Sequence, residues 1–364
     1  MSVQVSLGKQ TLLAVILVII VLLVIEIIAQ ILLLNIEEEC RTKAVYYEEY
    51  DEEVVDQLCT DYKNIKYLDS TIRTNQPNQL TETYSINEHG FRGESFDFVK
   101  GNDEYRIIMV GGSTTFGLGS TSNDQTIPSH LESILNEKFQ KNIKVINAGV
   151  IASTSSSEVY YIQNHLIKFQ PDLIIVFDGY NDSFNIKMDD INPEDQFVSN
   201  LNLSPFELFI RDNFKFFATP NVIFLYTYDY LQNQYLTNDI KIQNTQKWLD
   251  RWNKTCNVAH ENNFELFVTV QPMIGTSDRD LTEIEKNIKE KGKSSIQYQK
   301  TFEFLNHLGD NIDSLSCPHA DLRHTFDGIE GQVFHSLVHT GDKQNEIIAY
   351  EISEHIESII KNTV

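Results

Sequence analysis

The sequence predicts an α/β fold of three layers (α/β/α), in which helices cover both faces of a central parallel sheet. Short apolar runs typical of buried strands occur at 105–110, 143–147, 173–177 and 264–272. Segments with apolar residues at helical spacing separate the first three runs. Strands that alternate with amphipathic helices are typical of parallel sheets, whose ligand sites lie beyond the carboxyl ends of the strands.

The helices follow from the spacing of apolar side chains. The segment "TIPSHLESILNEKF" (126–139) places its apolar residues on one helical face. The segment "SSSEVYYIQNHLIKF" (155–169) begins with serines that suit a helix N-cap and continues with apolar residues at helical spacing. The chain ends in a helix with four isoleucines on one face, Ile348, Ile352, Ile356 and Ile359.

An apolar run near the N-terminus predicts one transmembrane helix. Residues 12–34 are apolar except for Glu26 and Gln30, and this length crosses a hydrocarbon core of about 30 Å. A cleaved signal peptide is the alternative, but the run is long for one and no A-x-A-like site follows it. The predicted organisation is a tail (1–10), a transmembrane anchor (11–34), an acidic stalk or packed extension (35–83) and a larger domain (84–364).

An aromatic-rich insertion, roughly 185–242, interrupts the alternation of strands and helices. Its phenylalanines and tyrosines favour a helical subdomain in which they pack as core residues. A lid over the ligand site is the alternative.

The side of the membrane on which the domain lies is not decided by basic residues, because Lys9 precedes the anchor and Arg41 and Lys43 follow it. An acidic triplet at 37–39 and an even number of cysteines compatible with disulfides favour an extracellular domain. Unpaired buried thiols are the alternative for these residues. The cysteines are Cys40, Cys59, Cys256 and Cys317.

The whole net charge of −23 lies beyond the anchor, where Lys9 and Glu26 cancel each other. A domain this acidic is a poor partner for nucleic acid and for anionic lipid surfaces. We therefore expect no nucleic-acid partner, and expect the membrane to be contacted through the N-terminal helix.

The stretch "YRIIMVGGSTTFGLGS" (105–120) places a serine, Ser113, in a glycine-rich turn directly after a buried strand. It is not a phosphate loop, because Leu118 and Gly119 stand where G-x-x-x-x-G-K-[ST] needs lysine and Ser or Thr. It also lacks the G-x-G-x-x-G of dinucleotide sites. A serine at the carboxyl end of a strand is instead placed as an exposed nucleophile, although such turns are more often only structural.

Three further segments support a catalytic interpretation. "NAGV" with Gly149 follows the second strand, and "DGYND" with Asn181 follows the third, so both meet Ser113 at the same edge of the sheet. A backbone N–H at a glycine and an asparagine amide are suitable donors for an oxyanion hole. His339 lies just before the last helix and is the candidate general base.

Together these segments resemble the SGNH hydrolases, also called GDSL-like esterases, whose blocks contribute Ser, Gly, Asn and His in this order. "GGSTTFG" resembles the first block, "NAGV" the second, "GYND" the third and "VHTGDKQNEIIA" the block with the histidine. "INEHGFRG" and "QPDLIIVFDGYND" are similar to a bacterial and archaeal subgroup. The resemblance covers about 84–361, apart from the details of the insertion.

The resemblance implies an SGNH, flavodoxin-like α/β/α fold and cleavage of ester or thioester bonds through an acyl-enzyme. Ser113 would attack the acyl carbon and His339 would take its proton. The N–H groups of Ser113 and Gly149 and the Asn181 amide would stabilise the oxyanion. No metal or organic cofactor is implied, and the expected substrates are small-molecule, glycan or lipid acyl esters at the cell surface.

The sequence departs from the family pattern at two positions. Gly112 stands where the family usually has Asp before the serine, and Ser336 stands where D-x-x-H would place the acid that orients the histidine. Loss of such an acid costs about 10⁴-fold in turnover in a serine protease. Asp327, Asp342 or Ser336 itself remain candidates for orienting His339. The alternatives to an esterase are an O-acyltransferase with the same site and an SGNH-fold binding protein with impaired catalysis.

Overall fold

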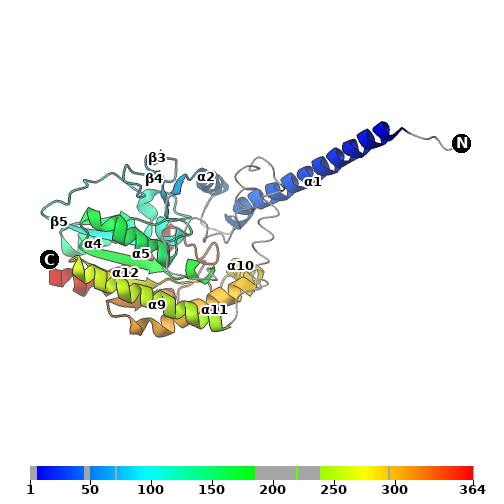
Figure 1. Ribbon diagram of the computed structural model, residues 1–364. Helices are drawn as coiled ribbons and strands as arrows, with labels where there is room; N and C mark the ends of the chain where they lie inside the picture. Colours follow the sequence, from blue (N-terminus) through cyan, green and yellow to red (C-terminus); the bar gives the residue numbers. More distant parts are fainter. Residues whose placement is uncertain are drawn as a thin grey trace.

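The computed structural model describes residues 6–44, 50–69, 72–184, 219, 238–293 and 296–363 (Figure 1). Its body is a five-stranded sheet with the order β6-β5-β7-β8-β9, and every pair of neighbouring strands is parallel. The predicted α/β fold with a central parallel sheet is therefore confirmed. The strands are β5 (Glu104–Gly111), β6 (Asn142–Asn147), β7 (Leu173–Asp178), β8 (Glu265–Val270) and β9 (His319–Asp321).

The helices form two groups, one for each face of the sheet. In the first group α12 packs on α4, and in the second α9 packs on α5 and α11. The connection from β5 to β6 and the connection from β6 to β7 run in opposite directions, so right-handed crossovers place α4 and α5 on opposite faces. The helices are α4 (Ile127–Phe139), α5 (Ser155–Asn164), α9 (Asn238–Glu261), α10 (Glu283–Lys293), α11 (Ile296–Asn311) and α12 (Asp342–Thr363).

The strand order also determines where a ligand can bind. The chain leaves β5 to form β6 on one side and then returns across β5 to form β7 on the other side. The connections that leave β5 and β7 therefore diverge, and Gly111 at the end of β5 pairs with Phe177 near the end of β7. A crevice at the carboxyl ends of two such strands is the usual ligand site of an open parallel sheet.

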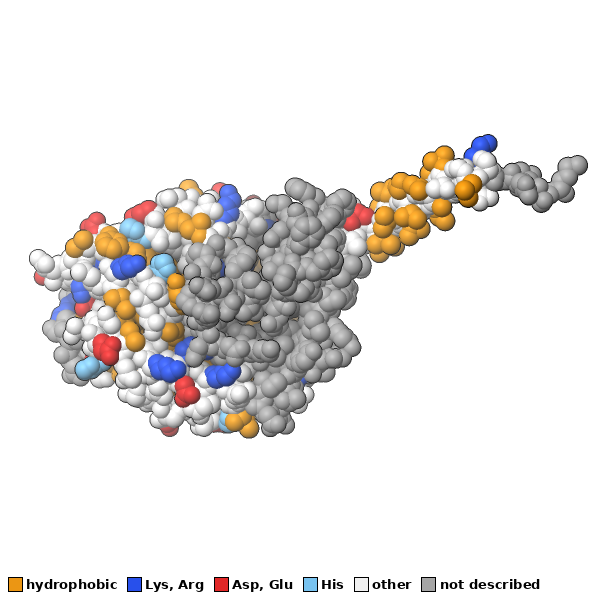
Figure 2. Space-filling view, viewed as in Figure 1, with side chains coloured by type: hydrophobic (Ala, Val, Ile, Leu, Met, Phe, Trp, Pro, Cys, Tyr) orange, Lys and Arg blue, Asp and Glu red, His pale blue; other side chains and the backbone are white. Residues whose placement is uncertain are grey.

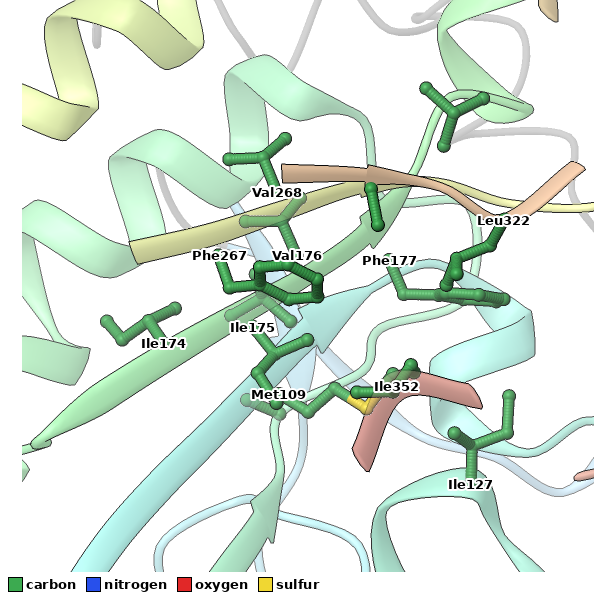
Figure 3. Close-up of a cluster of buried hydrophobic side chains, with 14 of the residues drawn as sticks. Met109, Ile127, Ile174, Ile175, Val176, Phe177, Phe267, Val268, Leu322 and Ile352 are labelled. Carbon is green, nitrogen blue, oxygen red and sulfur yellow. The ribbon is translucent and has the colours of Figure 1, made fainter. Parts of the chain in front are cut away.

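The core lies on both faces of β7, whose six residues are all buried. Figure 3 shows Ile174 and Val176 on this strand together with Met109, Phe267 and Ile352 from neighbouring elements. Each fully buried apolar side chain of this size contributes about 1.5–3 kcal/mol. The core is the reason that the ends of β5 and β7 hold rigid positions for the site.

An N-terminal extension packs against one edge of the body. It contains α2 (Glu52–Lys63) and the short strands β1 (Tyr67–Asp69), β2 (Arg73–Asn75), β3 (Gln79–Leu80) and β4 (Ser85–Ile86). Asp61 at the end of α2 accepts hydrogen bonds from the amide and the hydroxyl of Thr83, at 2.9 and 2.8 Å. The amide of Arg92 then donates to the carbonyl of Asn147 on β6, at 3.2 Å. Asn75 of β2 donates to the carbonyl of Gly149, at 3.0 Å, so residues 50–83 are joined to the body by a specific hydrogen bond as well.

Helix α1 (Leu7–Ala44) extends away from the body (Figure 1) and continues past the predicted anchor into the predicted stalk. Its segment Leu7–Ile31 is long and apolar enough to cross a membrane, with a mean hydropathy of 3.5, and is only 6% buried. Hydrophobic side chains cover the visible surface of this segment (Figure 2). A signal sequence near an N-terminus passes the same test of length and composition, so the helix is weak evidence for an anchor.

The predicted insertion, about 185–242, lies mostly outside the described residues, so its role as lid or subdomain stays a prediction. Two parts of it are described. Helix α9 begins at Asn238, inside the predicted range. Thr219 donates through its hydroxyl to the carboxylate of Glu26 on α1, at 2.8 Å.

The cysteines of the body form a disulfide between Cys256 and Cys317. Cys256 lies on α9, and Cys317 lies just before β9, so the bond joins a covering helix to the edge of the sheet. Cys59 on α2 is also disulfide-bonded. The alternative of free buried thiols is therefore wrong for these three cysteines.

Candidate active site

Ser113 lies at the carboxyl end of β5, where the sequence placed it, and is the first residue of the short helix α3 (Ser113–Phe116). Two glycines precede it because larger residues do not fit. A Cβ at Gly111 would overlap the Thr115 hydroxyl and the carbonyl of Phe177, and a Cβ at Gly112 would overlap the Asn181 amide nitrogen. The glycines therefore let β5 turn sharply and bring Asn181 beside Ser113.

His339 reaches Ser113 from the loop before α12. The His339 Nε2 atom lies 2.8 Å from the Ser113 Oγ, and its Nδ1 atom lies 2.7 Å from the Ser336 Oγ. The loop is a tight turn in which the amide of His335 donates to the carbonyl of His339, at 3.0 Å. Ser113, His339 and Ser336 thus form a continuous hydrogen-bonded chain.

The Ser336 hydroxyl occupies the position where a carboxylate would orient the histidine. It accepts hydrogen bonds from the amides of His339, at 3.1 Å, and Val338, at 3.4 Å. Unlike a carboxylate, a hydroxyl both donates and accepts, so it does not force the proton of His339 onto Nδ1. General-base action at Nε2 requires that proton to be on Nδ1.

The two candidate aspartates lie elsewhere. Asp342 is the first residue of α12. Its carboxylate accepts hydrogen bonds from the amide and the hydroxyl of Thr121, at 3.0 and 2.6 Å. The Asp327 carboxylate accepts from the amide of Asp278, at 2.6 Å, and faces His324. Neither has a hydrogen bond to His339 among the described residues. The hypothesis that Asp342 or Asp327 orients His339 is therefore wrong in this structure.

The histidine is held in its neutral form. Burial, and then the neighbouring His335, lower the pKa of His339 to about 3, and burial lowers the pKa of His335 to about 4. The two rings are stacked, with centroids 5.8 Å apart and planes at 18°. A neutral imidazole has a free lone pair to accept the serine proton, but without a carboxylate its imidazolium form is poorly stabilised.

Gly149 does not have its predicted role in this structure. Its amide N–H donates to the side-chain oxygen of Asn147, at 3.1 Å, and is therefore not directed at an oxyanion. Its carbonyl accepts from Asn75, at 3.0 Å, and a Cβ there would overlap the backbone of Phe116. Gly149 is instead needed for the close approach of this loop to α3.

Asn181 lies beside Ser113 and carries a free donor. It begins the single turn η3 (Asn181–Phe184), and its side-chain amide donates one N–H to the carbonyl of Ser153, at 2.7 Å. A primary amide has a second N–H. Within the described parts of the chain, the amide N–H groups of Ser113 and Ala152 have no acceptor either. Three N–H groups on the loops that follow β5, β6 and β7 thus have no acceptor among the described residues.

Sequence reasoning did not single out Ala152, because alanine has no polar side chain. Its backbone takes the left-handed conformation with φ +63°. Asn78, Gln140, Gln170 and Asn263 take this conformation as well, so it does not by itself mark a functional residue. Ala152 is exposed and adjoins Ser153, which Asn181 contacts.

A buried polar network holds the Asn181 turn. The Asp182 carboxylate accepts from the amide of Ser155, at 3.0 Å, and from its hydroxyl, at 2.5 Å. Arg251 of α9 donates to the same hydroxyl, at 2.7 Å. Trp248 of α9 donates to the Asp178 carboxylate, at 3.0 Å. Helix α9 therefore supports the turn that presents Asn181.

Arg92, in the segment "HGFRG", supports the other end of α3. Burial lowers its pKa to about 10, so it stays charged at neutral pH, and all five of its N–H groups donate. A cation beside the terminal carbonyls of a helix is favourable. The acceptors are the carbonyls of Phe116, Gly117, Thr83 and Ser122 and the side-chain oxygen of Asn123.

No protein-family model matches the sequence, and no curated protein matches it. Several solved structures are similar. An α/β hydrolase enzyme from the metagenome of Lake Arreo, Spain, is 10% identical with a TM-score of 0.41, and the match covers 69% of this chain and 94% of that chain.

Two further similar structures are a putative lipolytic protein of the G-D-S-L family and an acetyl xylan esterase. The first, from Desulfitobacterium hafniense DCB-2, is 11% identical with a TM-score of 0.38, and the match covers 69% of this chain and 98% of that chain. The second, AlAXEase, is 13% identical with a TM-score of 0.39, and the match covers 69% and 99%. These identities and TM-scores are low, so the functional assignment depends on the residues of the site.

Proposed function

We propose that the chain is a serine esterase of the SGNH type that cleaves acyl esters through an acyl-enzyme. The observation that carries the proposal is the 2.8 Å contact between the Ser113 Oγ and the His339 Nε2 at the carboxyl end of β5. A serine and a neutral histidine at this distance have the geometry of a nucleophile and its general base.

The reaction has two steps. In the first, the Ser113 hydroxyl gives its proton to His339 and its oxygen bonds to the acyl carbon. The C–O bond to the alcohol then breaks, and the alcohol leaves with the proton from His339. In the second step, water gives a proton to His339 and attacks the acyl carbon, which releases the acid and restores Ser113 with that proton.

We assign the oxyanion hole to the amide N–H groups of Ser113 and Ala152 and to the second N–H of the Asn181 side chain. Each lacks an acceptor among the described residues, and Asn181 and Ser153 both lie beside Gly112. Removal of one such donor costs about 10²–10³ in kcat.

For the location of the enzyme, we propose that α1 anchors it and that the body lies outside the cell. The apolar segment of α1 and the disulfides at Cys59 and between Cys256 and Cys317 support this placement, because disulfides persist in oxidising compartments. Treatment of intact cells with an external protease tests it. We expect the protease to degrade the body of the protein on intact cells. A body that stays protected until the cells are lysed would contradict the proposal.

The catalytic proposal is tested on the full-length protein with a fluorophosphonate probe and a series of p-nitrophenyl esters. We expect one adduct by intact mass on the wild type, no adduct on Ser113→Ala and a weaker one on His339→Ala. The exposed Ser133 provides a matched control, because Ser133→Ala should label like the wild type. Equal labelling of Ser113→Ala and wild type would exclude Ser113 as the nucleophile.

Ser336 in place of the usual acid favours a second candidate, a binding protein with impaired catalysis. A folded wild type that binds an acyl ester without labelling or turnover would support this candidate. The acyltransferase alternative uses the same site and differs in its acceptor. Free acid as the sole product, unaffected by added sugars, would exclude it.

A further inference from the structure

The segment between α1 and the body contacts the loop that follows the catalytic helix. The Tyr62 hydroxyl on α2 accepts a hydrogen bond from the amide of Gly119. The Tyr50 hydroxyl, just before α2, donates to the carbonyl of Gly119, at 3.2 Å, and accepts from the amide of Asp342, at 3.1 Å. Two tyrosines from this segment therefore hold both polar backbone groups of Gly119.

Gly119 in turn contacts the ring that stacks on the catalytic histidine. Its backbone has φ +104°, and a Cβ there would overlap the Nε2 edge of His335. The His335 ring stacks on the His339 ring. Only two contacts, Tyr62 to Gly119 and Gly119 to His335, thus separate α2 from the neighbour of His339.

The rest of the extension makes these contacts rigid. Tyr84 packs against Phe116, which belongs to the same short helix as Ser113, and Ile65 packs against the cluster that contains both. Asp61 fastens the end of α2 through the amide and hydroxyl of Thr83. Burial raises the pKa of Tyr62 to about 12, so its hydroxyl stays neutral at any working pH and keeps its hydrogen-bonding role.

We propose that residues 50–65 form a positioning element for His339, and that activity depends on the segment that links α1 to the body. Tyr62 and Tyr50 act through Gly119 and His335 and touch no substrate, so they are positioning residues. The inference rests on the proposed esterase function. It follows that a form cut before Tyr50 stays active and that a form lacking α2 loses activity.

The test compares Tyr62→Phe, Tyr50→Phe and the double variant in the full-length protein, with a p-nitrophenyl ester as substrate. Tyr62→Phe keeps the ring and removes the acceptor of the Gly119 amide. We expect kcat to fall at least tenfold with KM within twofold, and a smaller fall for Tyr50→Phe. Tyr161→Phe is the matched control, because Tyr161 is a buried tyrosine on α5 and should keep wild-type kcat.

A pH profile separates positioning from a general loss of stability. If the His335 and His339 rings move apart, water reaches His339 and its pKa rises from about 3 toward 6.5. The acid limb of kcat/KM should then move to higher pH in Tyr62→Phe and stay in place in Tyr161→Phe. A uniform fall in active fraction would leave the limb where it is.

The outcomes are distinct. Folded Tyr62→Phe and Tyr50→Phe variants that keep kcat within twofold and an unmoved acid limb would overturn the inference and leave the esterase proposal intact. If Tyr62→Phe does not fold, Tyr50→Phe decides, since it leaves α2 and its packing in place. Absence of turnover and of probe labelling in the wild type would overturn both proposals.

Discussion

Ser336→Asp is the substitution that tests most directly how the site works without an acid. In the structure the Ser336 Oγ lies 2.7 Å from the His339 Nδ1 and accepts from the amides of Val338 and His339. Those two amides would donate equally to a carboxylate and would keep it ionised. The aspartate is one bond longer than the serine, so the turn must open slightly to admit it.

The expected gain follows from Coulomb's law. A carboxylate about 4 Å from the centre of an imidazolium stabilises it by about 4 kcal/mol at an effective dielectric constant of about 20. At about 1.4 kcal/mol per pKa unit this raises the pKa of His339 from about 3 to about 6. The same energy corresponds to about 10³ in rate, and desolvation of the carboxylate removes part of it. We therefore expect kcat/KM to rise by about 10- to 10³-fold.

The assay is hydrolysis of p-nitrophenyl esters across the pH range, with melting temperature as a check of folding. Ser336→Asn is the matched control, because it has the size of aspartate and no charge, and it should not gain activity. A folded Ser336→Asp with kcat/KM at or below wild type would refute the reasoning. An equal gain in Ser336→Asn would show that the charge is not responsible.

Three further predictions follow from the site and the disulfide. His339 has a pKa of about 3 and therefore stays neutral as the pH falls through the physiological range. The kcat/KM of the wild type should then show no acid limb between about pH 5 and pH 8. An acid limb near about pH 6.5 would contradict this prediction. Gly112→Ala places a Cβ against the Asn181 amide. With the same esters as substrates, kcat should fall by about 10²-fold with little change in KM. An unchanged kcat would argue against Asn181 as an oxyanion donor. The double variant Cys256→Ser, Cys317→Ser removes the disulfide, whose cysteines are 61 positions apart in the sequence. It should lower the free energy of unfolding, measured by urea titration, by about 4 kcal/mol. A loss below about 1 kcal/mol would show that the loop is already constrained in the unfolded chain.

The strands and helices of the body could be predicted from the sequence because their apolar pattern is local. Strand β7 is buried on both faces and is therefore a continuous apolar run, whereas β9 (His319–Asp321) is only three residues long and has no such pattern. The strand order was likewise not readable, because hydrogen bonds between strands join residues far apart in the chain.

By itself, the sequence determined which residue types stand at the carboxyl ends of β5 and β7 and before α12, and thus the candidates Ser113, Asn181 and His339. The tertiary structure decided the roles that depend on long-range hydrogen bonds. The His339 Nε2 atom lies 2.8 Å from the Ser113 Oγ, 226 positions away in the chain, and the Asn181 side-chain amide donates to the carbonyl of Ser153, 28 positions away. A side chain's partner is set by the packing of distant elements, and no local pattern encodes it.

The same reason explains why the role of the extension emerged only from the structure. An acidic, tyrosine-containing segment is typical of a stalk, and nothing in its pattern indicates contact with a loop more than fifty residues away. The placement of Tyr50 and Tyr62 on Gly119 depends on how the segment around α2 lies against the loop after α3. That packing arises from the assembled core, where Phe116 clusters with Tyr84 and Ile65 packs against that cluster.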